Sequence, residues 1–313
     1  MNDFLITLIT VAGVLLFVIP GFLLVKFKAV PENHIKSFSK VLMMVCQPVL
    51  TFYSFQKVTY STSNTYLIGL TFLMALLLML LVMLVMAFIL RKHFANVTNR
   101  VLCVSAAFGN VAFLGVPIIE ALLPDFTQGA MICTTFLTVM NILGWSLASY
   151  LITQDKKYIS LKKILLNPAT IGFLISLIFY FCDFHLATIP YVGSTIDSSL
   201  MILAKMSTAL CMIILGMRLA TINLKNFFCS FQNYVAVIIK QLVIPFIVFG
   251  ILYAIPLDSD FKITFVVLAS TPIAAVVQNF TEMINQGQES AADMVILGTI
   301  LSIVTVPLVS LVL

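Results

Sequence analysis

Apolar runs separated by short polar stretches set the pattern of this chain. Most runs are about 20 residues long, the length at which an α-helix crosses the hydrocarbon core of a bilayer. The pattern predicts ten membrane-spanning helices, at residues 4–25, 38–56, 66–90, 99–122, 128–152, 166–182, 197–219, 231–255, 261–284 and 291–312. No basic segment precedes the first run, and the run is long enough to remain as a helix, so we expect no cleaved signal.

Composition indicates the same class. The 313 residues are 61% hydrophobic and 9% charged, whereas soluble domains carry roughly 25% charged residues. We therefore expect an all-α polytopic membrane protein surrounded by the lipid bilayer. The net charge of +5 does not indicate nucleic-acid binding, because the basic residues cluster in loops beside helices. The 6 Cys are scattered without a C-x-x-C pair, so we expect no metal, no cofactor and no disulfide framework.

The distribution of basic residues predicts the orientation of the helices. Lys and Arg gather in the loops after the first, third, fifth and seventh predicted spans, whereas the opposite loops hold only Lys57 and Lys262. Because cytoplasmic loops carry an excess of Lys and Arg, we expect both termini to lie outside the cytoplasm, with the protein in a plasma membrane. The loop after the ninth span is the exception, since it carries Glu282, Glu289 and Asp293 and no basic residue.

A short polar linker, residues 154–165, divides the chain into two sets of five predicted spans, residues 1–153 and 166–313. An odd number of spans per half forces the second half to enter the membrane in the opposite orientation. We therefore expect two inverted five-helix repeats joined by a cytoplasmic linker, an arrangement common among secondary transporters.

Two of the predicted spans are interrupted in corresponding places, the fourth at residues 109–117 (GNVAFLGVP) and the ninth at residues 270–272 (STP). Lipid offers no replacement hydrogen bonds, so irregular backbone at this depth must be buried in protein or line a wet cavity. Proline removes one backbone donor from a helix interior but fits at the start of a helix. Pro117 and Pro272 are therefore expected to open second half-helices near the bilayer midplane.

The expected half-helix ends indicate the chemistry of a ligand. Each helix N-terminus offers free N–H groups and about half a positive charge, so two such ends facing one cavity suit a carboxylate. The candidate substrate-binding residues lie at or near the two breaks: Asn110, Gly115, Pro117, Thr271, Pro272, Gln47, Asn141, Gln278 and Asn279. Thr299 and Ser302 lie at similar depth. For Asn141 and Ser302 a hydrogen bond between helices is an equally good interpretation.

Charged residues inside predicted spans are costly and are candidates for function. Lys205 and Lys240 either pair with a substrate carboxylate or extend to the nearer membrane surface. Glu120 and Glu282 are the acids that either titrate during transport or lie at wet helix ends. Coupling to protons and coupling to sodium both remain open on the sequence.

Several short motifs resemble one known family. The pattern Asn110-x4-Gly115-x-Pro117 resembles the broken fourth helix of the auxin efflux carrier family, which includes plant PIN-FORMED carriers and bacterial malate or malonate permeases. Thr271-Pro272-x-Ala274 resembles the ninth helix of that family. Residues 298–308 (GTILSIVTVPL) and 215–219 (LGMRL) resemble its tenth and the end of its seventh.

The resemblance implies the fold of bile-acid/sodium symporters, with helices 4 and 9 as broken crossover helices. It implies a scaffold of spans 1, 2, 6 and 7, a transport domain of spans 3–5 and 8–10, an elevator-like motion and a homodimer. Ala209 stands where the family often has proline, and the linker is far shorter than the long loop of plant carriers. The short linker favours a bacterial permease for malate or another small carboxylate over an auxin-like exporter of aromatic carboxylates.

Two other classes of function compete with transport. An intramembrane enzyme would need a nucleophile with a base or a metal cluster, and the sequence carries no G-x-S-x-G or H-E-x-x-H motif. A sensor that binds a carboxylate without moving it fits the same residues. We therefore expect a non-enzymatic secondary transporter, with the sensor as the alternative.

Overall fold

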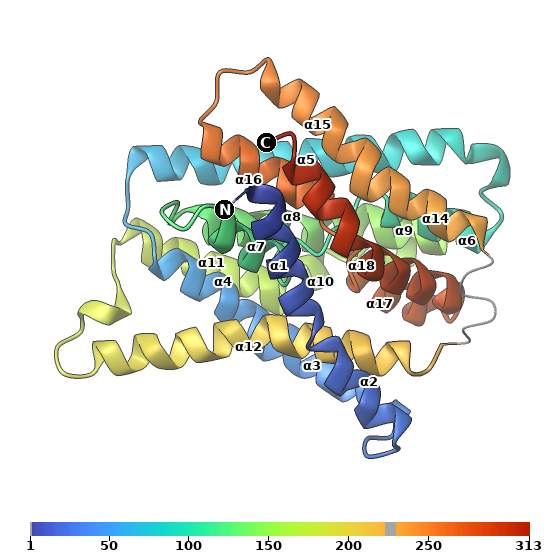
Figure 1. The fold of residues 1–313 in the computed structure, drawn as a ribbon, viewed down its shortest axis with the longest axis horizontal. Helices are drawn as coiled ribbons and strands as arrows, with labels where there is room; N and C mark the ends of the chain where they lie inside the picture. Colours follow the sequence, from blue (N-terminus) through green and yellow to red (C-terminus); the bar gives the residue numbers. More distant parts are fainter. Residues whose placement is uncertain (1, 223–229) are drawn as a thin grey trace.

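The computed structural model describes residues 2–222 and 230–313, apart from the side chains of residues 279, 280, 283 and 284. Within these ranges the chain is helical, and the isolated bridge between Gly109 and Ile273 is its only β-structure. Figure 1 shows long helices crossing the molecule around a group of shorter ones. The predicted all-α class is confirmed.

The helices of the first half of the chain are α1 (Asp3–Leu15), α2 (Val18–Lys26), α3 (Ile35–Val41), α4 (Gln47–Gln56), α5 (Thr62–Ile89), α6 (Val97–Ser105), α7 (Gly115–Leu122), α8 (Gly129–Leu143) and α9 (Ser149–Thr153). Those of the second half are α10 (Leu161–Leu165), α11 (Pro168–Phe181), α12 (Gly193–Leu219), α14 (Phe231–Ile238), α15 (Ile244–Tyr253), α16 (Ser259–Ser270), α17 (Val276–Ile284) and α18 (Gln288–Ser310).

Among the described residues, 8 helical stretches are long and apolar enough to cross a membrane. They are Asp3–Lys26, Glu32–Gln56, Thr62–Ile89, Gly129–Thr153, Lys156–Phe181, Gly193–Leu219, Phe231–Tyr253 and Gln288–Ser310. Each overlaps a predicted span, although Lys156–Phe181 begins inside the predicted linker, residues 154–165. The other two predicted spans, 99–122 and 261–284, are the interrupted ones, built from α6 with α7 and from α16 with α17.

Two of the long stretches contain a π-helical turn directly ahead of a proline. The turn η2 (Leu42–Cys46) precedes Pro48, and η7 (Ile239–Val243) precedes Pro245. Proline lacks the N–H that the regular helix ladder needs, and a wider turn accommodates the gap. The turn η7 also carries two buried polar side chains, Lys240 and Gln241, toward the interior.

Helix α12 packs closely on α2 through two glycines. A methyl group added at Gly21 would lie 2.0 Å from the Ile213 carbonyl oxygen, and one at Gly216 would lie 2.0 Å from that of Val18. Small residues allow two helix backbones to approach this closely in membrane proteins. This contact fixes the end of α12, where Arg218 lies two residues after Gly216.

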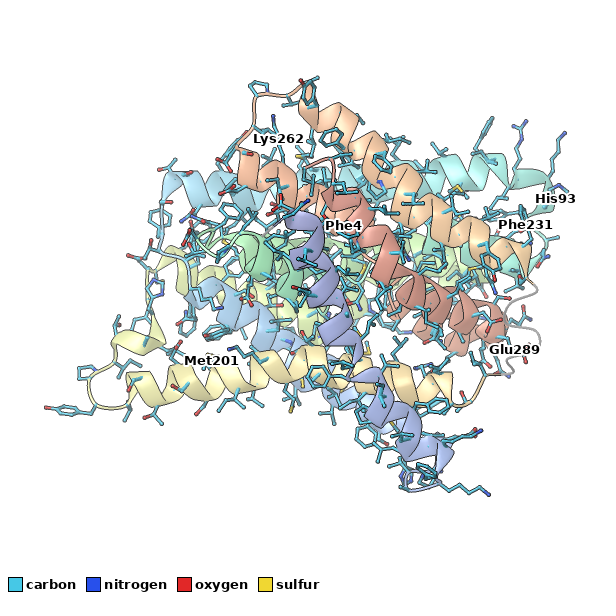
Figure 2. All side chains as sticks on the ribbon, viewed as in Figure 1. Phe4, His93, Met201, Phe231, Lys262 and Glu289 are labelled. Atoms are coloured by element: carbon cyan, nitrogen blue, oxygen red, sulfur yellow. The ribbon has the colours of Figure 1, made fainter. Side chains whose placement is uncertain are left out.

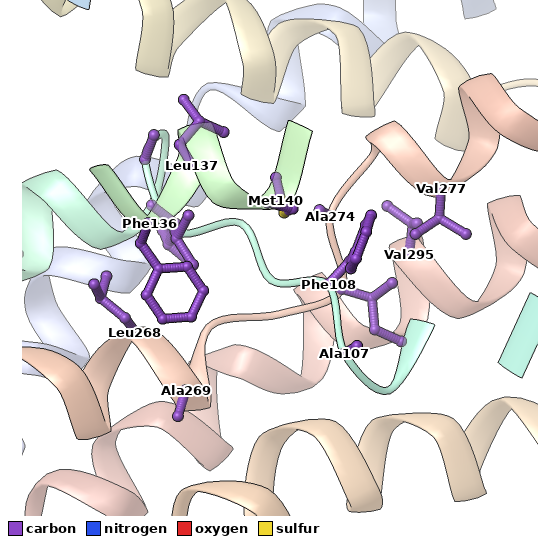
Figure 3. Packing of buried hydrophobic residues seen from close by; sticks show 14 of the residues in the cluster. Ala107, Phe108, Phe136, Leu137, Met140, Leu268, Ala269, Ala274, Val277 and Val295 are labelled. Atoms are coloured by element: carbon purple, nitrogen blue, oxygen red, sulfur yellow. The ribbon is translucent and has the colours of Figure 1, made fainter. Parts of the chain in front are cut away.

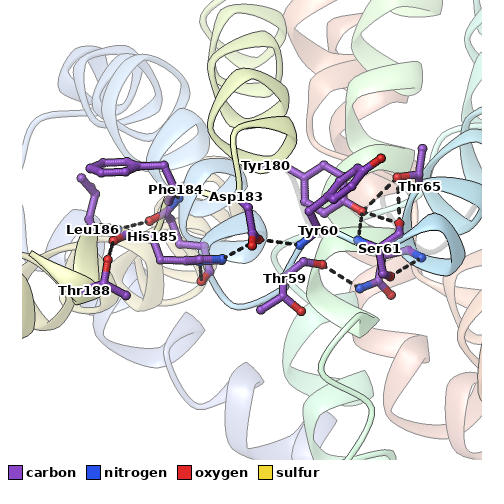
Figure 4. Close-up of polar contacts among 12 residues, drawn as sticks. Thr59, Tyr60, Ser61, Thr65, Tyr180, Asp183, Phe184, His185, Leu186 and Thr188 are labelled. Atoms are coloured by element: carbon purple, nitrogen blue, oxygen red, sulfur yellow. Dashed lines mark hydrogen bonds and ion pairs between the residues drawn. The ribbon is translucent and has the colours of Figure 1, made fainter.

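The loop between α4 and α5 is tied to the segment after α11 by polar contacts (Figure 4). The Asp183 carboxylate accepts the Tyr60 backbone N–H at 2.8 Å. The Tyr180 hydroxyl donates to the Ser61 carbonyl at 3.1 Å. His185 lies 2.9 Å from the Gln56 carbonyl. These bonds satisfy backbone groups that the helix ends leave open and hold α4 against α11.

The outer helices present large apolar side chains, which project from the molecule in Figure 2. On α5, Leu73, Leu77 and Leu81 are each more than half exposed, as expected for a helix that faces lipid. The segment Gly129–Thr153 is the opposite case, with 78% of its most apolar window buried. Helix α8 in this segment therefore lies at the centre, beside the two interrupted segments.

Candidate functional site

The two interrupted segments lie side by side (Figure 3). A short extended stretch at residues 108–110, between α6 and α7, pairs antiparallel with one between α16 and α17, through the bridge of Gly109 and Ile273. The Asn110 N–H donates to the Pro272 carbonyl at 2.7 Å, and the Ala274 N–H donates to the Phe108 carbonyl at 3.0 Å. Each break therefore satisfies backbone groups of the other, which a membrane interior requires.

Gly109 makes this close pairing possible. A methyl group added there would lie 2.4 Å from Thr271 Oγ1 and 3.0 Å from Lys240 Nζ. Neither neighbour is free to move, since the Thr271 hydroxyl donates to the Leu268 carbonyl at 2.7 Å and the Lys240 ammonium donates to the Ala269 carbonyl at 2.5 Å. Lys240 thus places its amino group at the carbonyl end of α16, where a helix leaves carbonyl groups without intrahelical donors.

A buried cavity of about 70 Å³ lies against the paired breaks. Its walls include the turn that leads into α7, Val111–Phe113, and the start of α17, Ala275 and Val276. Polar side chains complete it: Gln47, Asn110, Asn141, Arg218 and Thr299. Cys211 is also in the wall.

Five residues in the wall of this cavity have backbone N–H groups without protein acceptors. In the described part of the chain, the N–H groups of Val111, Ala112, Phe113, Ala275 and Val276 make no hydrogen bond to protein. A buried N–H without a partner costs about 1–3 kcal/mol. Both helix starts also carry the positive end of the helix dipole, α7 over 8 residues and α17 over 9. Water or an anion can supply the acceptors that these groups lack.

Arg218 adds a full positive charge to the same wall. Its Nη1 donates to Glu282 Oε1 at 3.0 Å, and its Nε is buried without a partner among the described residues. The sequence reasoning counted Arg218 as a loop cation and did not propose it as a site residue. The available signal was its position in the last turn of an apolar helix, inside the segment 215–219 that resembles the family.

Three predicted residues line the cavity: Asn110, Gln47 and Asn141. The Asn141 amide donates to the Leu137 carbonyl of its own helix at 2.9 Å, which leaves its carbonyl oxygen available. Thr299 lines the cavity as well. Ser302 does not line it, since its hydroxyl donates to the Thr299 carbonyl at 2.6 Å.

Four predicted residues at the breaks lie outside the cavity wall. Gly115 packs on Leu268, which would lie 2.7 Å from an added methyl group. Pro117 is in the first turn of α7, as expected, and Thr271 follows the end of α16. The expectation that Pro272 opens a half-helix is wrong. Helix α17 begins at Val276, because the chain at Pro272 is extended and pairs with Asn110.

The remaining candidates lie in two other hollows. Gln278 and Glu282 line one of about 360 Å³, and the buried Gln278 Oε1 has no partner among the described residues. Glu120 lines the second, of about 280 Å³, with Lys205, and its carboxylate lies 3.0 Å from Lys57 Nζ. Lys205 is exposed on α12, as expected for a side chain that extends to the surface. The side chain of Asn279 lies outside the described residues.

The two acids on the second half-helices are therefore both ion-paired. Glu120 on α7 pairs with Lys57, which follows α4, and Glu282 on α17 pairs with Arg218 near the end of α12. Each pair joins a half-helix to a neighbouring long stretch. Neither acid faces the cavity between the breaks.

Long apolar helices around an internal cavity define a class, a polytopic α-helical membrane protein. A family model described as membrane transport protein matches the chain over residues 6–161 and 156–310. The chain belongs to this membrane transport family, the auxin efflux carrier family, which confirms the resemblance carried by Asn110, Gly115 and Pro117. No curated protein matches the chain. Membership of a transport family fits the expectation of a non-enzymatic protein.

Proposed function

We propose that this protein is a secondary transporter of small organic anions, with malate as the representative substrate. One observation carries the proposal. The residues ahead of α7 and at the start of α17 line the same cavity as Arg218, and their N–H groups have no acceptor among the described residues. Helix N-termini and arginine are the groups that bind carboxylates in proteins. No acidic side chain is in the described wall of this cavity.

The size of the cavity favours a small substrate. A buried water needs about 10–15 Å³, so a cavity of about 70 Å³ holds only a few water-sized groups. This favours a compact carboxylate over the alternative of an auxin-like aromatic one. Asn110, Gln47 and Asn141 then supply donors and acceptors for the hydroxyl and second carboxylate of such a substrate.

We propose that ten spans form two inverted repeats, residues 1–153 and 166–313, joined by the linker 154–165. The two matched segments of the family model meet inside this linker, at 156–161, which supports the division. The similar construction of the α6–α7 and α16–α17 segments supports the repeat. The basic loops support an orientation in which both termini lie outside the cytoplasm. We propose that the membrane is the plasma membrane.

For the transport step we propose an elevator-like motion of spans 3–5 and 8–10 against a scaffold of spans 1, 2, 6 and 7. Helix α12 packs on α2 and α4, and α11 packs on α4, which supports a scaffold of these elements. The ion pairs Lys57–Glu120 and Arg218–Glu282 both join this scaffold to the moving group. Each pair must break when its half-helix moves. We propose that a second copy of the chain completes the scaffold as a homodimer.

Uptake of labelled malate into proteoliposomes tests the proposal. We expect saturable uptake that other small carboxylates inhibit, and a stimulation by either a proton or a sodium gradient identifies the coupling. Asn110→Ala should abolish uptake while thermal stability stays near that of the wild type. Asn33→Ala, at an exposed position, serves as the control. Malate binding without uptake would favour the sensor, and absence of both from folded protein would refute the malate proposal.

A further inference from the structure

A second groove lies where η2, α10 and the π-helical turn η4 (Gly144–Ala148) meet. It has a volume of about 540 Å³. Lys40, Lys162 and Lys163 line it, together with Trp145, Met44 and Leu166. None of these residues lines the cavity of the proposed transport site, although Met43 of η2 lies in the walls of both. The charged part of the groove therefore needs an account of its own, which rests on the proposed function only for the side of the membrane.

The three lysines give the groove an uncompensated positive charge. In the described part of the chain none of them is in an ion pair, and all three are exposed. The acid in the adjoining loop, Asp155, pairs with Lys157 at 2.8 Å instead. The Lys163 ammonium lies 5.2 Å from the centre of the Trp145 ring, a cation–π distance that positions the charge over the groove.

Apolar side chains continue directly from this charged wall. Within the groove, Met44 is 64% exposed and Leu166 is 58% exposed. Beside it on α10, Leu161 is 69% exposed and Leu165 is 50% exposed. Water would solvate such side chains poorly, whereas lipid chains would cover them. The short helix α10 combines these leucines with Lys162 and Lys163, a composition typical of segments that lie in the membrane interface.

We propose that this groove binds one anionic phospholipid. The phosphate lies among Lys40, Lys162 and Lys163, and an acyl chain follows Met44 and Leu166. Basic pockets between transmembrane helices on the cytoplasmic side are sites of this kind, and each basic residue near an anionic surface contributes about 1 kcal/mol. Trp145 fits the interface, where an amphipathic ring contacts both headgroup and chain.

Native mass spectrometry of the purified full chain tests the proposal with phosphatidylglycerol and phosphatidylcholine of identical acyl chains. We expect preferential retention of phosphatidylglycerol. The triple variant Lys40→Gln, Lys162→Gln, Lys163→Gln should weaken that binding on the order of 100-fold, about fivefold for each lysine. Lys26→Gln with Lys92→Gln and Lys156→Gln is the matched control, because it removes the same number of charges at exposed lysines outside the groove, and it should retain binding.

Equal retention of the two lipids by the wild type would overturn the proposal without any variant. Equal loss in the triple variant and in the control would also overturn it, because the effect would then be one of general charge. Competition with inorganic phosphate distinguishes a lipid phosphate from a free phosphate ion as the group that the lysines bind. Failure of millimolar phosphate to displace the lipid supports the proposal, whereas displacement would assign the lysines to a soluble phosphate. A single variant, Lys163→Gln, repeats the comparison with minimal change to the fold.

Discussion

Substitution of Gly109 by alanine tests the pairing of the two breaks. The added methyl group would lie 2.4 Å from Thr271 Oγ1 and 3.0 Å from Lys240 Nζ, and both atoms are held by hydrogen bonds. The two extended stretches must therefore separate, which weakens the bonds at 2.7 and 3.0 Å that join them. Overpacking costs about 1–3 kcal/mol, and each weakened hydrogen bond adds about 0.5–1.5 kcal/mol.

The sum is a loss of roughly 2–6 kcal/mol. A change of 1 kcal/mol shifts the melting temperature of a protein somewhat smaller than this one by about 2–4 °C. We therefore expect Gly109→Ala to lower the apparent melting temperature in detergent by roughly 4–24 °C and to abolish malate uptake. Fluorescence-detected thermal unfolding of the purified protein measures the shift.

Gly69→Ala is the matched control, since nothing lies within 4 Å of a methyl group at that position of α5. Alanine in a helix interior is favoured over glycine by roughly 0.5–1 kcal/mol, so this variant should melt at or slightly above the wild-type temperature. If Gly109→Ala melts within about 2 °C of the wild type and transports malate normally, the breaks do not pair as described.

Three further substitutions separate the roles of the charged residues. Lys240→Met removes the amino group that donates to the Ala269 carbonyl. The melting temperature should therefore fall by several degrees, with little change in the KM for malate. A raised KM at an unchanged melting temperature would instead make Lys240 a substrate ligand. Glu282→Gln frees Arg218 from a carboxylate that competes with the substrate. The KM measured by uptake should therefore fall about fivefold, which corresponds to an ion-pair energy of about 1 kcal/mol. A rise in the KM would contradict the role of Arg218. The hydrogen bond from the Tyr60 N–H lowers the pKa of the Asp183 carboxyl group. The stabilisation from this bond is therefore complete above the ordinary pKa of about 3.9, and it is lost as the pH falls through the lowered pKa. Asp183→Ala should therefore melt below the wild type at pH 7, with the gap closing in acid; a gap independent of pH would exclude the carboxylate as its cause.

Much of the fold follows from the apolar pattern alone. Runs of about 20 apolar residues have few alternatives to a spanning helix, and the positions of Asn110, Pro117 and Pro272 identify the two segments that a helix cannot cross intact. The residues at each break do not by themselves predict how the two interrupted segments pair with each other. That Pro272 lies in an extended stretch, four residues before α17, depends on the Asn110 N–H from the other half of the chain.

The candidate site was predictable in its polar residues and less so in its charges. Asn110, Gln47 and Asn141 stand out as amides within apolar spans, and all three reach the cavity. Arg218 was not predicted as a site residue, because a basic residue at a helix end is usually interpreted as an anchor at the membrane surface. Gly109 was equally hidden, since its requirement comes from Thr271 and Lys240 on other segments.

The central claim is that the cavity between the paired breaks binds a small carboxylate. Binding of labelled malate to the purified protein measures it most directly, with unlabelled malate and its uncharged diamide as competitors. We predict saturable binding that malate displaces and the diamide does not, together with loss of binding in Asn110→Ala and unchanged binding in Asn33→Ala. Equal displacement by the diamide, or full binding by folded Asn110→Ala, would contradict a carboxylate site at this cavity.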